Sequence, residues 1–93
     1  MNTESEINAH FFPIINALAD KHDTASLTSR AVYEAYLRTY EGRRLIKTGE
    51  AWAAYEIARA ARLAAEAEMN AAYDARAAAK KKLKAAMRKA ARA

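Results

Sequence analysis

The last part of the chain, Glu50 to Ala93, is one run that contains neither glycine nor proline. Alanine, the residue with the highest helix propensity, recurs throughout it, and Arg, Lys, Glu, Leu and Met supply most of the other positions. Their straight side chains lose little rotamer freedom in a helix. The run predicts one continuous helix over about residues 50–90. At 1.5 Å per residue the whole run would be about 65 Å long, more than a compact domain of this size needs, so we expect it to meet a partner.

The N-terminal part of the chain predicts a first helix over about residues 4–22. Thr3 and Glu6 have the spacing of a capping box, in which each side chain bonds the backbone of the other. Pro13 falls inside the apolar pattern and lacks an N–H, so we expect the helix to kink or restart there. One apolar face nevertheless persists through the segment at helical spacing, formed by Ile7, Phe11, Ile14, Ile15 and Leu18.

A second helix is predicted over about residues 27–46, after a polar loop at His22–Ser26. Ser26 and Thr28 are both suitable N-caps. Gly42 is a candidate C-terminal signal, and Thr48-Gly49 separates this helix from the long one. The helix would present one broad face made of Val32, Tyr33, Tyr36, Leu37 and Tyr40. The chain as a whole predicts an all-α fold, with two short N-terminal helices packed on a long C-terminal helix.

Two seams compete on the long helix. A heptad that begins at Trp52 places Tyr55 and Met69 on one seam, but the same seam also holds arginines such as Arg62 and Arg76, which suit a coiled coil poorly. The second seam is made of small residues that would let another helix approach closely. We therefore expect this second seam to pair with another copy of the chain, through Ile57, Ala61, Ala64, Ala71, Ala75 and Ala78.

The apolar core is expected to be small, because 26 of the residues are alanine and alanine buries little area. Bulky side chains are concentrated before Tyr73. The sequence predicts a mutually buried cluster of Phe11, Leu18, Tyr36, Leu37 and Trp52.

Positive charge is confined to the C-terminal end. Residues 1–49 are neutral and residues 50–79 carry a net charge of −2, whereas residues 80–93 hold seven Lys and Arg and no acidic residue. We divide the chain into a helical domain, 1–79, and a basic helical tail, 80–93. Such a tail is typical of proteins that bind nucleic acid or acidic partners. Its candidate binding residues are Lys80, Lys81, Lys82, Lys84, Arg88, Lys89 and Arg92, and Arg43, Arg44 and Lys47 form a second basic patch.

Several other functions find no support in the sequence. The chain has no cysteine, which fits a cytoplasmic protein, and its start lacks the pattern of a signal peptide. No window is apolar enough to span a membrane, and the tail has too few apolar residues for us to expect membrane binding. His10 and His22 are too far apart for a helical metal pair. No catalytic or phosphate-loop motif is present, so we expect neither an enzyme nor a cofactor.

Two functions remain. The first is a small non-enzymatic protein whose basic helix holds nucleic acid, or a nucleoprotein complex, without reading bases. The second is a protein-interaction or inhibitor protein that docks through its long helix, in the manner of a phage or mobile-element accessory protein that blocks a host machine. A helix-turn-helix that begins near Thr28–Arg30 is a weaker possibility, because the connection before it is longer and more polar than usual.

Overall fold

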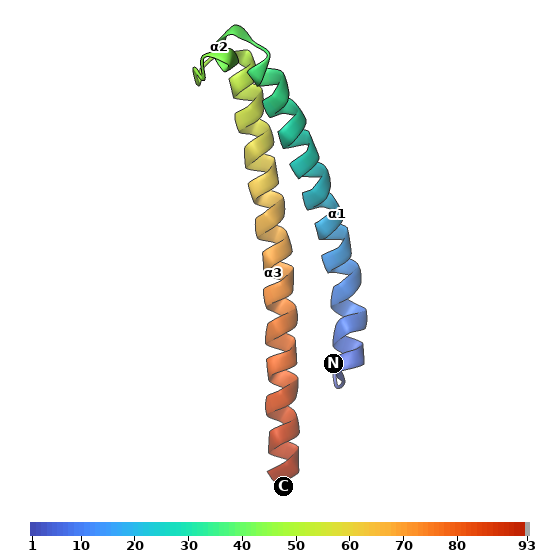
Figure 1. Ribbon diagram of the computed structural model, residues 1–93. Helices are drawn as coiled ribbons and strands as arrows, with labels where there is room; N and C mark the ends of the chain where they lie inside the picture. The colour runs from blue at the N-terminus through green and yellow to red at the C-terminus, as the bar shows by residue number, and fades with distance from the viewer. Residues whose placement is uncertain (93) are drawn as a thin grey trace.

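The computed structural model describes residues 1–92, and these form three helices: α1 (Glu4–Leu37), α2 (Tyr40–Arg43) and α3 (Glu50–Arg92). Figure 1 shows α1 and α3 side by side and antiparallel, with α2 in the turn that joins them. The molecule is a rod with extents of 71 × 19 × 13 Å. The predicted all-α fold, with an N-terminal helical part packed on a long C-terminal helix, is confirmed. Ala93, the last residue of the predicted tail, lies outside the described residues.

The start of α1 follows the predicted cap in one direction only. The hydroxyl of Thr3 accepts a hydrogen bond from the backbone N–H of Glu6 at 3.1 Å. The Glu6 carboxylate accepts in turn from the N–H of Asn2, also at 3.1 Å, rather than from Thr3 as a capping box requires. Two N–H groups before the first helical hydrogen bonds are thereby satisfied.

The predicted loop at His22–Ser26 is wrong, because α1 runs through it without interruption. Ser29 is buried and His22, Ala25 and Ser26 are half-buried, so this stretch packs on α3. Packing of this kind outweighs the weak helix propensity of Asp, Thr and Ser.

Pro13 also lies inside α1 without ending it, and Figure 1 shows α1 as one gently bowed helix. The helix does not restart at Pro13. Pro13 and Ala9 are both exposed. Water can therefore satisfy the Ala9 carbonyl, which has no N–H partner at Pro13.

The predicted helix over 27–46 is wrong in its bounds, since α1 ends at Leu37 and the chain turns at residues 38–39. The Thr39 hydroxyl donates to the Tyr36 carbonyl at 2.6 Å and accepts from the N–H of Gly42 at 3.1 Å. A Cβ at Gly42 would lie 1.8 Å from that same carbonyl oxygen. Gly42 is thus required by the close approach of α2 to α1, and not as the predicted C-terminal signal.

The left-handed residue that ends α2 is Leu45, with φ of 56°. The N–H of Ile46 bonds the Glu41 carbonyl at 2.8 Å, and the N–H of Leu45 bonds the Gly42 carbonyl at 3.1 Å. These two bonds are those of a Schellman motif, in which glycine usually takes the left-handed position. The Tyr36 hydroxyl donates to the Ile46 carbonyl at 2.6 Å and ties this turn to α1.

The contact between α1 and α3 follows a heptad on both helices. On α3 every second contact position is alanine, and Ala58 and Ala65 are buried. The positions between them carry larger side chains. The buried and half-buried positions at alternating spacings of three and four, the spacing of a coiled coil, are Asn8, Phe11, Ile15, Leu18, His22, Ala25, Ser29, Val32 and Tyr36 on α1 and Ala51, Tyr55, Ala58, Arg62, Ala65, Met69, Ala72, Arg76, Ala79 and Leu83 on α3.

Polar contacts fix the register of the two helices. Lys80 pairs with Glu4 at 3.1 Å near the open end of the hairpin, and Lys21 pairs with Glu68 at 3.0 Å near its middle. The Arg76 guanidinium donates two hydrogen bonds to the Asn8 side-chain oxygen, at 3.1 and 3.0 Å. This register places the end of α1 beside the start of α3 and the start of α1 beside Lys80.

The predicted single core cluster is wrong. Tyr36 is buried and its ring contacts Trp52, with 5.1 Å between centroids. Leu37, however, is 38% exposed. Phe11 and Leu18 are half-buried in the part of α1 nearer the open end, well away from Trp52. In place of one cluster, a narrow line of buried side chains follows the hairpin, formed by Ile7, Ile15, Tyr36, Ala58 and Ala65.

Candidate nucleic-acid interface

The basic tail is the free end of α3. Figure 1 shows the C-terminal end of α3 running past the N-terminus of α1, so among residues 1–92 no helix packs beside its last turns. Every residue from Lys84 to Arg92 is exposed. The helix is continuous at Lys80, because its backbone bonds do not depend on α1 and alanine and lysine favour the helix.

One of the seven cations of the tail, Lys80, binds α3 to the start of α1. Its ammonium lies 3.1 Å from the Glu4 carboxylate, and its side chain is only 31% exposed. The hydrogen bond and the positive charge of Lys80, with smaller effects of Lys84 and Arg76, lower the pKa of Glu4. The carboxylate of Glu4 is thus held in its charged form against α3.

The remaining cations of the tail have no ion-pair partner among residues 1–92. They cover one broad side of α3. The opposite side carries Leu83, Met87 and alanines, which line open grooves beside Met1 and Asn2. The tail is therefore amphipathic, rather than cationic all round as its composition suggests. The exposed cationic side consists of Lys81, Lys82, Lys84, Arg88, Lys89 and Arg92.

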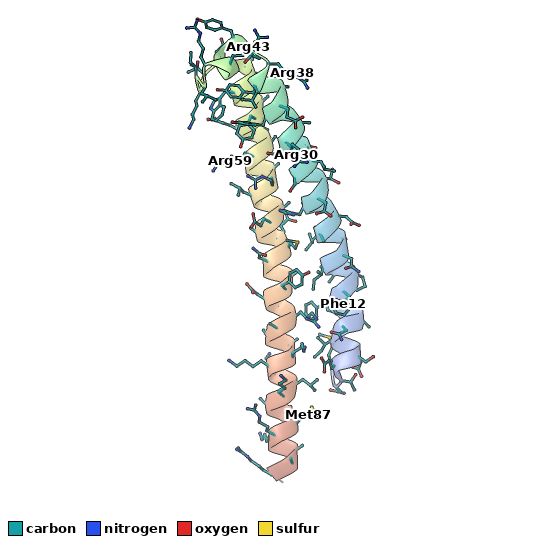
Figure 2. The ribbon with its side chains drawn as sticks, viewed as in Figure 1. Phe12, Arg30, Arg38, Arg43, Arg59 and Met87 are labelled. Atoms are coloured by element: carbon teal, nitrogen blue, oxygen red, sulfur yellow. The ribbon has the colours of Figure 1, made fainter. Side chains whose placement is uncertain are left out.

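The second predicted patch, Arg43, Arg44 and Lys47, lies at the turn. Figure 2 labels Arg43 at one end of the rod and Met87 near the other. The Arg44 guanidinium lies 4.7 Å from the centroid of the Tyr40 ring, and the Lys47 ammonium lies 5.8 Å from that of Trp52. These cations partly stabilise the turn by cation–π contacts. They do not join the tail in one continuous basic stripe.

Arginines outside the predicted patches also gather towards the turn, as Figure 2 shows for Arg30, Arg38 and Arg59. Arg59 lines a shallow pocket with Lys47 and the aromatic residues Tyr33, Trp52 and Tyr55. Sequence spacing did not reveal this pocket, because its residues come from α1, the turn and α3. The antiparallel hairpin alone brings them together.

The helix-turn-helix interpretation is wrong. Thr28, Ser29 and Arg30 lie in the middle of α1 rather than at the N-terminus of a recognition helix. Ser29 is buried against α3. Residues in this position cannot lead a helix into a groove of DNA.

Both histidines lie in α1, where they make packing contacts. The ring of His10 meets that of Phe11 edge to face, with 4.7 Å between centroids, and His22 is half-buried in the hairpin. Within the described residues, no cluster of three or more His, Cys, Asp or Glu is placed to hold a metal ion. In the same part of the chain, no helix has an apolar stretch long enough to cross a bilayer.

The predicted seam on α3 stays uncovered. Its members, Ile57, Ala61, Ala64, Ala71, Ala75 and Ala78, are all exposed, because α1 packs on the neighbouring alanine positions. These six residues are here called the alanine face. The structure therefore presents a hairpin with a basic free end, a basic turn and an uncovered alanine face. Comparison of the chain with protein-family models, with curated proteins and with solved structures finds no match in any of the three.

Proposed function

We propose that the protein is a non-enzymatic binding protein whose basic free end engages the phosphates of nucleic acid, alone or within a nucleoprotein complex, without reading bases. The observation that carries this proposal is the basic C-terminal end of α3, residues 81–92. Six exposed cations lie there without an acidic partner among residues 1–92. Solubility alone does not require the cations to be concentrated at one end, because charges scattered over the surface keep a protein soluble equally well.

This end of α3 suits a phosphate backbone in size and in charge. Residues 81–92 span about 17 Å of helix, and duplex DNA presents one negative charge per about 1.7 Å of its axis. Six contacts would give a slope of about −5 for the logarithm of the association constant against the logarithm of the salt concentration. Because the contacts go to phosphates, affinity should vary little with sequence.

Two variants with equal loss of charge test the proposal. Replacing Lys81, Lys82 and Lys89 with Gln should reduce the salt slope by about three, one per lost phosphate contact. Replacing the turn cations Arg43, Arg44 and Lys47 with Gln should leave it almost unchanged. Fluorescence anisotropy with random-sequence duplex DNA and RNA measures both slopes.

Deletion of residues 84–93 provides a second test that spares the fold. The deletion keeps Lys80 and its bond to Glu4, so the helicity of the remaining hairpin should persist. We expect it to remove most nucleic-acid affinity. A truncated protein that binds as well as the full chain would refute binding through the end of α3 and would leave the cations of the turn as the candidate site.

The rival function, a protein-interaction or inhibitor protein, draws support from the length of α3 and from large apolar side chains left exposed on it, such as Leu63 and Tyr73. A pulldown from a cell lysate, with and without nuclease, separates the two functions. Partners that vanish after nuclease treatment favour nucleic acid. Partners that persist favour direct binding to protein.

A further inference from the structure

The hairpin exposes more surface than a compact chain of its length. Its accessible surface is 6898 Å². A folded monomer of the same mass exposes about 5,400 Å², so the excess is about 1,500 Å². Obligate homodimers bury about 2,000–5,000 Å² in total, or 1,000–2,500 Å² from each partner. If each of two copies covered its excess surface against the other, the total buried area would fall within that range.

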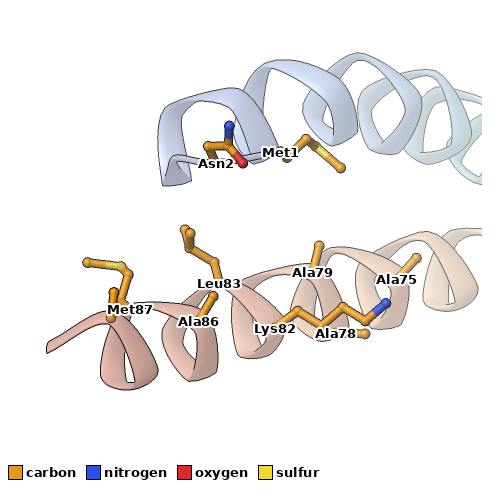
Figure 3. A pocket seen from close by; sticks show the side chains of 10 residues that line it. Met1, Asn2, Ala75, Ala78, Ala79, Lys82, Leu83, Ala86 and Met87 are labelled. Carbon is orange, nitrogen blue, oxygen red and sulfur yellow. The ribbon is translucent and has the colours of Figure 1, made fainter. Parts of the chain in front are cut away.

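The alanine face on α3 carries an apolar projection near one end and an apolar groove at the other. The projection is Ile57, whose side chain is 73% exposed. The groove, shown in Figure 3, lies about 40 Å further along α3 and is lined mainly by Ala75, Ala78, Leu83, Ala86 and Met87. Ala75 and Ala78 belong to the same face as Ile57, so projection and groove open on one side of the molecule.

From these observations we propose that a second copy of this chain covers the alanine face. The two α3 helices lie antiparallel, side by side, about a two-fold axis near Ala71. Ile57 of each copy then enters the groove of the other. A two-fold interface requires this reciprocity, because each surface meets its own counterpart. Ala64 and Ala71 lie on this face between projection and groove, and their small side chains let the two helices approach closely.

The charges on this face allow such a contact. Glu68 is already paired with Lys21 of its own copy, at 3.0 Å. The stem of Lys82 lines the groove, and its ammonium can remain in water at the edge. The central positions Ala64, Ala71 and Ala78 carry no charge. The cations of the two tails would lie at opposite ends of the dimer and would not repel each other.

Association is measured by sedimentation equilibrium in buffer without nucleic acid, so the outcome does not depend on the proposed function. We expect a dimer at micromolar concentration. Ala71→Glu should raise its dissociation constant at least about 100-fold, because two carboxylates would be buried together. Ala77→Glu, at an exposed position on another side of α3, should leave it unchanged. Circular dichroism checks that both variants stay helical.

Engineered thiols test the orientation, since the chain has no cysteine of its own. In the antiparallel dimer Ala64 of one copy faces Ala78 of the other. A double variant, Ala64→Cys with Ala78→Cys, should therefore form disulfide-linked dimers on oxidation. The two positions are about 21 Å apart on one helix, too far for a bond within one copy. Each single variant should stay unlinked.

Three results would overturn the proposal. The unaltered protein could sediment as a monomer at high micromolar concentration. The double variant could fail to cross-link. Either single variant could link to itself, which would show that like residues face each other in a parallel pair.

Discussion

Enlarging a single alanine in the contact between α1 and α3 should destabilise the hairpin. Ala65 is 1% exposed and lies near the middle of α3, close to the Glu68 that pairs with Lys21 of α1. Ala65→Leu inserts three heavy atoms where the two helices touch, so α1 must move away or adopt strained side-chain conformations. Overpacking of this kind costs about 1–3 kcal/mol.

The expected shift is large enough to measure. For a domain of fewer than 100 residues, 1 kcal/mol lowers the melting temperature by about 4–8 °C. Ala65→Leu should therefore lower it by at least about 4 °C, as followed by circular dichroism at fixed protein concentration. The matched control is Ala77→Leu, which makes the same change at an exposed position of α3. Its effect should stay within about 0.5 kcal/mol.

The comparison can fail in two ways. If Ala65→Leu melts at the same temperature as the unaltered protein, Ala65 does not face α1. If both variants lose equal stability, the loss comes from the helix itself and not from its contact with α1. Either result would refute the heptad described above.

Four further substitutions test other parts of the fold. Ile15→Ala, at a buried site, should cost about 2–5 kcal/mol in chemical denaturation, whereas Leu37→Ala should cost less than about 1 kcal/mol because that side chain is partly exposed. Leu45→Gly should raise the free energy of unfolding by up to about 1 kcal/mol in the same assay, because glycine adopts the left-handed backbone without strain and the Leu45 side chain is exposed. A lower free energy of unfolding would mean that the Leu45 side chain contributes contacts of its own. Because Lys80 lowers the pKa of Glu4 in the fold from its ordinary 4.5, the stabilisation is present above pH 4.5 and is lost as the pH falls through the lowered value. The melting temperature of Glu4→Gln should then lie below that of the unaltered protein at neutral pH and converge with it in acid, and a constant difference would contradict the pairing.

For two reasons, the sequence alone did not identify the positions of α3 that contact α1. Arginine at a contact position argued against this seam, yet Arg76 fits there because its guanidinium bonds Asn8 and lies 4.6 Å from the centroid of the Phe12 ring. Those partners are more than sixty residues away in the chain. In the contact on α3, alanines alternate with larger side chains. Each of these alanines lies one position before the corresponding position of the heptad that begins at Trp52. A pattern built on bulky residues alone therefore selected the wrong neighbours.

The tail illustrates what sequence can determine of the candidate site. The concentration of Lys and Arg at the end of α3 is a property of composition, and the helix that carries them follows from local propensity. Which of these cations are free depends on where α1 begins. Lys80 meets Glu4, and the residues beyond Leu83 extend past that contact.

The sequence by itself determined the helical class, the extent of α3 and the position of the positive charge, because each depends on residues close together in the chain. Only the tertiary structure decided that His22–Ser26 is helical, that Gly42 is needed beside the Tyr36 carbonyl and that the alanine face is left uncovered. These features depend on the antiparallel pairing of α1 with α3. Burial against a distant helix can outweigh local propensity, and a single sequence does not reveal which distant residues will meet.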